Sequence, residues 1–212
     1  MKSKITLSLI AALILAVSAC KGAKPSGSSN SNSASANANK ASANLGKSVP
    51  AAKTVPVPAN WDTMADEEKG YGFQLPAGSQ THNENHDGVD VFAASTPEPS
   101  KVALFVMAFK NRSLSKDDLL KFASGFLEGL NEKDIKIGMA VELSGDYSLA
   151  TISSTDENGK VTKGKVLVAT DVSDNYVMIL GTPEADFAEN EKIIDAIWGS
   201  FTMRSGGSTG KS

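Results

Sequence analysis

The 212-residue sequence predicts an α+β fold, an antiparallel sheet of about six or seven strands covered by two main helices. Three observations support this expectation. Several short runs in residues 61–203 alternate apolar and polar side chains between turn residues, which is typical of strands. Two longer segments repeat apolar residues every three to four positions, as amphipathic helices do. The links between strands are short, which favours antiparallel pairing.

The first half of this region predicts three strands and a helix. Residues 71–75 alternate apolar and small or polar side chains, and 88–94 form a second strand. Residues 102–109 are apolar on both faces, so they indicate a central strand that is covered on two sides. Ser115 is the expected N-cap of the first helix, with acidic residues in its first turn, and Asn131 is its expected stop.

The second half predicts four strands and a closing helix. Asn158 and Gly159 form a hairpin signal, because this pair readily adopts positive φ. Thr182 is the expected cap of the last helix, with Pro183 at its first position. The predicted strands are residues 135–143, 147–153, 163–170 and 176–180.

Charge divides the chain into a basic start and an acidic body. Residues 21–60 hold five Lys and no acid, whereas 61–203 hold twelve Lys or Arg and all 24 Asp and Glu, a net −12. Nucleic-acid binding needs clustered Lys and Arg, so we expect no nucleic-acid partner. One Cys and two His exclude a disulfide framework and a Cys-rich metal site.

Residues 1–19 have the form of a signal peptide. A short cationic start precedes an uncharged stretch over 5–19, which is too short to span a bilayer. Small residues through Ala19 then precede Cys20, and this pattern resembles the lipobox of bacterial lipoproteins. The resemblance implies cleavage between Ala19 and Cys20, a thioether-linked diacylglycerol on Cys20 and an acylated amine. Lys21, in place of Asp, implies the outer membrane, facing the periplasm, if the host is Gram-negative. An ordinary signal peptide with an incidental Cys is the alternative.

Residues 20–60 predict a lipidated Cys followed by a disordered linker. The segment is rich in Ser, Asn, Ala and Pro, holds no aromatic residue and has few large aliphatic ones. It cannot bury enough apolar surface to offset the entropy lost on ordering. Residues 204–212, rich in Gly and Ser, predict a disordered tail.

The domain resembles a known family at both of its ends. Residues 70–78 carry an aromatic-x-Phe-x-hydrophobic-Pro pattern, and 193–201 read Ile-Ile-Asp-Ala-Ile-Trp-Gly-Ser-Phe. Together with the strand order, these resemble the Mog1/PsbP/DcrB-like domains. The resemblance implies an α-β-α sandwich, a non-catalytic accessory module that works by binding partners. It carries over no catalytic residue and implies no cofactor.

Candidate chemistry in the sequence is sparse. His82 and His86 are the candidate metal ligands, with Glu84 or Asp87 as a third, but Gly and Asn around them favour a polar surface loop over 78–88. The acidic 156–159 stretch lacks the later ligands of a calcium loop. Two further sets of side chains are interpreted structurally: Phe122, Phe126, Trp198 and Phe201 as core, and Trp61 and Tyr71 as a rim that could face a partner.

These observations lead to a functional hypothesis with alternatives. We expect a cell-envelope protein held to the membrane through lipidated Cys20. Its domain is expected to be a non-catalytic accessory or protein-binding module with an envelope protein as partner, rather than an enzyme. The alternative is a small-ligand or lipid-binding carrier, with its pocket between the helix over 115–131 and the sheet. A hydrolase is the least favoured, because no nucleophile lies in a recognisable setting.

Overall fold

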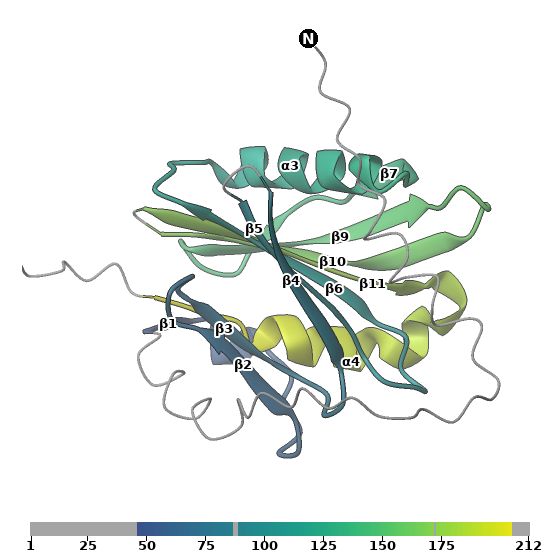
Figure 1. Ribbon diagram of the computed structural model, residues 1–212, viewed down its shortest axis with the longest axis horizontal. Coiled ribbons are helices and arrows are strands. Elements are labelled where there is room, and N and C mark those ends of the chain that lie inside the picture. The colour runs from purple at the N-terminus through teal and green to yellow at the C-terminus, as the bar shows by residue number, and fades with distance from the viewer. Residues whose placement is uncertain (1–45, 87–88, 172, 205–212) are drawn as a thin grey trace, which may run out of the picture.

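The computed structural model describes residues 46–86, 89–171 and 173–204. The predicted signal peptide, Cys20, the first part of the linker and the tail from residue 205 lie outside the described residues. The described chain forms one layered α+β domain, as the sequence predicts (Figure 1).

The main sheet is antiparallel and, within the described residues, has eight strands where six or seven were expected. Their order is β4-β5-β6-β11-β10-β9-β7, and β8 also pairs with β9. The strands are β4 (Gln80–His86), β5 (Val89–Ser95), β6 (Ala103–Lys110), β7 (Lys133–Ile137), β8 (Val141–Glu142), β9 (Tyr147–Thr155), β10 (Val161–Thr170) and β11 (Asp174–Pro183).

A second, smaller sheet joins the two ends of the domain in the order β1-β12-β3-β2. Helix α3 lies over one face of the main sheet, and helix α4 and the small sheet lie over the other (Figure 1). These elements are β1 (Lys47–Ser48), β2 (Asp62–Asp66), β3 (Tyr71–Leu75), β12 (Thr202–Met203), α3 (Lys116–Gly129) and α4 (Phe187–Gly199), with short 3-10 helices at Ala51–Lys53 and Glu184–Asp186.

Strand β6 is buried on both faces, as its uninterrupted apolar sequence predicts. Leu104 and Val106 pack into the α4-side core, whereas Phe105 and Met107 pack into the α3-side core. The same alternation continues in β11 and β10, because successive side chains of a strand point to opposite faces. The main sheet therefore separates two hydrophobic cores.

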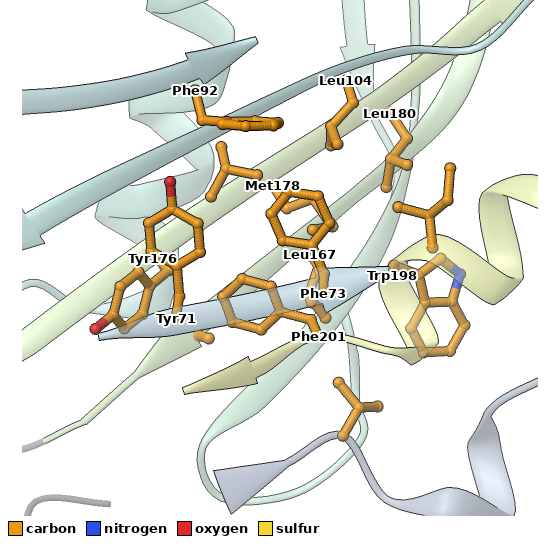
Figure 2. Packing of buried hydrophobic residues seen from close by; sticks show 14 of the residues in the cluster. Tyr71, Phe73, Phe92, Leu104, Leu167, Tyr176, Met178, Leu180, Trp198 and Phe201 are labelled. Atoms are coloured by element: carbon orange, nitrogen blue, oxygen red, sulfur yellow. The ribbon is translucent and has the colours of Figure 1, made fainter. Parts of the chain in front are cut away.

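Aromatic rings from distant parts of the chain build the α4-side core (Figure 2). Phe201 stacks on Tyr71 at 6.2 Å between ring centres and meets Tyr176 edge-on at 5.8 Å. The Tyr176 hydroxyl donates to the carbonyl of Gly70 at 3.1 Å, which joins the small sheet to β11. Burial raises the pKa of Tyr71, Tyr147 and Tyr176 above 10.0, so all three rings stay neutral in the folded domain at neutral pH.

Helix α3 begins and ends where the sequence predicts. The Ser115 hydroxyl accepts a hydrogen bond from the backbone N–H of Asp118 at 3.1 Å, so the N-cap is confirmed. Asn131 follows the helix with φ of 66°, a left-handed conformation that Asn tolerates. The turn at Gly159, with φ of 77°, confirms the predicted hairpin between β9 and β10.

Two strand predictions differ from the structure. The expected surface loop over 78–88 is largely strand β4, which lies at the sheet edge and pairs with β5 from residue 80 to residue 86. Backbone pairing forms this strand without any apolar side chain, which is why the sequence pattern misses it. The single strand expected over 135–143 is two strands, β7 and β8, because the chain leaves the ladder between them.

Three side-chain predictions were also wrong. Thr182 and Pro183 end strand β11 instead of opening α4, and the Thr182 hydroxyl accepts from the amide of Asn190 at 2.9 Å. Phe122 is 36% exposed rather than core, although it meets Phe109 edge-on at 4.6 Å. Tyr71 is only 3% exposed, so it is core and cannot form a rim for a partner.

The folded domain begins earlier than the predicted boundary at residue 61. Strand β1 pairs with β12, and the Val49 side chain is buried in the core. The Lys47 ammonium lies 2.9 Å from the Asp171 carboxylate, and this hydrogen bond is the main cause of the raised pKa of Lys47. The Tyr147 hydroxyl donates to the Lys47 carbonyl at 2.9 Å. Residues 46–50 are thus part of the fold rather than of a free linker.

We predict that a chain beginning at residue 61 is less stable than one beginning at residue 46. Removing Val49 alone gives up about 1.5–3 kcal/mol of apolar burial. The loss of the β1–β12 pairing adds to this. Urea unfolding followed by circular dichroism measures the difference, and equal midpoints would contradict a structural role for the segment.

Candidate functional site

A cavity of about 270 Å³ opens at one end of the main sheet, on its α3 side. It is built where β5, β9 and β11 end and where β6 and β10 begin. The last turn of α3 and the turn between β9 and β10 complete its wall. The cavity therefore lies near the position expected for the alternative carrier hypothesis, between the first helix and the sheet.

The length of α3 explains why space remains there. A helix of 14 residues spans about 21 Å, whereas a ten-residue strand such as β10 spans about 33 Å. The helix covers the middle of the sheet face and stops before the strands do. The uncovered end of an apolar sheet face becomes the floor of the cavity.

The wall of the cavity is mainly apolar. Phe105, Ile152 and Ile179 contribute from the sheet, and Leu127 and Leu130 from the end of α3. Four of these belong to the buried α3-side core, and Leu130 packs against it. An apolar cavity with few polar groups is the usual form of a small-molecule site.

The charged residues of the cavity come from its edge. Lys101 lies 3.5 Å from Asp186, outside the cavity, in an ion pair. Asp156 accepts backbone N–H bonds from Lys160 and Asn158, each at 2.8 Å, and the Lys160 bond is the largest cause of its lowered pKa. Glu132 also lines the cavity.

Glu132 differs from the other acids at the cavity. Its Oε2 atom is buried, yet it has no hydrogen-bond partner among the described residues. A buried carboxylate oxygen without a donor is costly, because the protein replaces none of the water it loses. Neither Glu132 nor the apolar wall was singled out from the sequence, since a Glu just after a helix is typical of a solvated surface.

The predicted metal candidates lie elsewhere, on edge strand β4. Residues 82 and 86 are four positions apart on a strand, which separates their Cα atoms by about 13 Å. The same spacing on a helix would bring them onto adjacent turns. His82 Nε2 lies 3.9 Å from Glu84 Oε2. In the described part of the chain, no group of three or more His, Cys, Asp or Glu side chains could hold a metal ion.

A second charged cluster lies on the α4 side and has a structural explanation. Lys165 of β10 is largely buried, with its ammonium 2.5 Å from Asp195 and 3.2 Å from Glu191. The indole N–H of Trp198 donates to the same Asp195 oxygen at 2.7 Å. The ammonium of Lys165 and the indole N–H of Trp198 are thus both paired. The cluster therefore holds α4 against the sheet and leaves neither donor for a ligand.

Comparison with known proteins places the fold. No family model and no curated protein matches the chain. The solution structure of cyanobacterial PsbP (CyanoP) from Synechocystis sp. PCC 6803 matches with a TM-score of 0.51 at 15% identity, over 69% of this chain and 94% of that one. A mutant of the protein Mog1 matches with a TM-score of 0.50 at 11% identity, over 69% of this chain and 97% of that one. The domain has a Mog1/PsbP-like fold.

At these identities, the Mog1/PsbP-like fold is what the likeness establishes. A more distant match is LpqN of Mycobacterium tuberculosis, described as involved in cell envelope biogenesis, with a TM-score of 0.36 at 17% identity over 71% of this chain and 82% of that one. Within the described ranges, no helix has the length and apolar character needed to cross a membrane.

Proposed function

We propose that the protein is a lipid-anchored component of a bacterial cell envelope whose Mog1/PsbP-like domain binds a small apolar ligand without converting it chemically. The cavity at the end of α3 carries the ligand-binding part of this proposal. Ligand binding is placed ahead of the accessory role because this cavity leaves room for a ligand, which a solidly packed interior would not.

The anchoring part of the proposal depends on Cys20, which lies outside the described residues. Small residues directly before the only Cys of the chain support lipidation. Two or three acyl chains hold a protein to a bilayer stably, since each buried methylene contributes about 0.8 kcal/mol. In a Gram-negative host, Lys21 favours the outer membrane, facing the periplasm.

We predict that Cys20→Ser abolishes incorporation of labelled palmitate and moves the protein from the membrane fraction to the soluble fraction. The hydroxyl of Ser cannot form the thioether on which the anchor depends. Ser33→Ala, in the same part of the chain, serves as the control and keeps both properties. Labelling and membrane retention of Cys20→Ser at the level of the control would contradict the anchor.

We predict that the cavity binds a neutral fluorescent dye such as N-phenyl-1-naphthylamine, and that Ala103→Phe reduces this binding at least about tenfold. Ala103 is only partly buried and lines the cavity, so a phenyl ring there occupies the space of a ligand. The matched control is Ala51→Phe, which adds the same ring at an exposed position outside the cavity.

The measurement is dye fluorescence titrated against the mature chain from Lys21, made without its signal peptide so that it carries no lipid. This chain keeps every described residue. Dye binding that is equally strong in Ala103→Phe and in the control would contradict ligand binding in the cavity. Melting curves of both variants exclude loss of folding as the cause.

An envelope protein partner is the second candidate function, and two exposed apolar side chains favour it. Met139 is 91% exposed and Val141 is 61% exposed, two positions apart where the chain passes from β7 into β8. Large apolar side chains grouped on an exposed segment are typical of protein contacts.

We predict that a photo-crosslinking residue at Met139 captures one defined envelope protein in intact cells. The same residue at Asn83, an exposed polar position on edge strand β4, is the control and captures none. Immunoblotting of the crosslinked products measures the outcome. The absence of any product that is specific to position 139 would remove the support for this second function.

A further inference from the structure

The backbone at the end of α3 fixes Glu132 at the edge of the cavity. Its N–H donates to the carbonyl of Leu127 at 3.0 Å, and the Asn131 N–H donates to the carbonyl of Glu128 at 3.0 Å. With Asn131 at positive φ, these two bonds form a Schellman motif. Strand β7 begins at the next residue, so Glu132 is held from both sides. The side chain of Glu132 therefore starts from a fixed backbone position at the cavity edge.

The other charges of the cavity already have counter-charges. Lys101 is paired with Asp186, and the positive charge of Lys160 contributes to the stabilisation of ionised Asp156. Among the described residues, Glu132 forms no ion pair, and its Oε2 is buried without a donor. Once these pairs are counted among the described residues, the cavity keeps one negative charge without a counter-charge, that of Glu132. The whole of residues 61–203 also carries a net charge of −12. Both features attract a cation.

The cavity volume limits the size of the ligand. At about 270 Å³, it lies just below the usual range for small-molecule pockets, roughly 300–1,000 Å³. Its wall is mainly apolar, and Glu132 is one of the polar and charged residues that also line it. This combination suits one medium-length hydrocarbon chain with a polar head, and it has too little room for a lipid with two acyl chains.

We propose that the cavity takes a single-chain amphiphile with a protonated amine head, which donates to the carboxylate of Glu132 at the cavity edge. This proposal rests on the proposed function, because it specifies the ligand of the same cavity. The hydrocarbon chain lies against the apolar wall around Phe105 and Ile179. The ammonium supplies the hydrogen bond and the positive charge that Glu132 lacks.

The test compares three probes with the same ten-carbon chain: decylamine, decanol and decanoic acid. Each displaces N-phenyl-1-naphthylamine from the mature chain at pH 7, where the amine is protonated and the acid is ionised. The series is repeated with Glu132→Gln, which keeps the size of the side chain and removes its charge. Glu128→Gln, on the exposed face of α3, is the matched control.

We expect decylamine to bind at least about tenfold more tightly than decanoic acid, because hydrogen bonds to charged groups are stronger than neutral ones and a second carboxylate is repelled by Glu132. Glu132→Gln should reduce this preference to about threefold or less and leave decanol binding unchanged. Glu128→Gln should keep the full preference.

Two results would overturn the inference in different ways. Equal displacement by all three probes in the wild-type chain would contradict the amine head and leave the apolar cavity as a ligand site. Failure of every probe and of the dye itself to bind would contradict the proposed function as well. The wild-type series alone decides between these results, so the test does not depend on whether Glu132→Gln folds.

Discussion

A sheet that is apolar on both faces is the constraint on which this structure depends. Strands β6, β10 and β11 direct alternate side chains into two separate cores, so neither face of the sheet can be left in water. The chain meets this need with one helix on one side and with a helix and a small sheet on the other. The ends of the domain are drawn into the fold for the same reason. Val49 and Phe201, which lie 152 positions apart, are both needed to complete the α4-side core.

The two faces are covered unequally, and the cavity results from this difference. On the α4 side, Tyr71, Tyr176 and Phe201 fill the space between the sheets with stacked and edge-on rings (Figure 2). On the α3 side, one helix lies over strands longer than itself. The Schellman motif ends this helix sharply and places Glu132 at the resulting edge. The incomplete covering of this sheet face thus leaves an apolar cavity with a carboxylate at its edge.

Much of the fold could be predicted from sequence because buried faces of strands and helices produce regular spacings of apolar residues. The alternation in β3, the continuous apolar run of β6 and the Ser115 cap each act over a few neighbouring residues, and each prediction was confirmed. Strand β4 leaves no such record, because its side chains are polar and only backbone pairing forms it. Strand β1 has two residues and depends on a partner at the other end of the chain.

The candidate site was harder to predict than the fold. The apolar residues that line the cavity have the same sequence pattern as residues that pack solidly, so no local signal separates them. Phe105 reads as core, and it is core on one side and cavity wall on the other. The relative lengths of α3 and of the strands decide where space remains, and that comparison requires the three-dimensional arrangement.

Strand β1 joins the domain at one end of the main sheet, and the cavity lies at the other end. Lys47 contacts Asp171, just after β10, and Tyr147, the first residue of β9. The cavity lies at the other end of these strands, about 25 Å away along β9. The chain that precedes Lys47 therefore joins the domain at the end remote from the cavity mouth. A tether that joins the domain at that end would leave the cavity end free to exchange ligand with the aqueous space or with a partner protein.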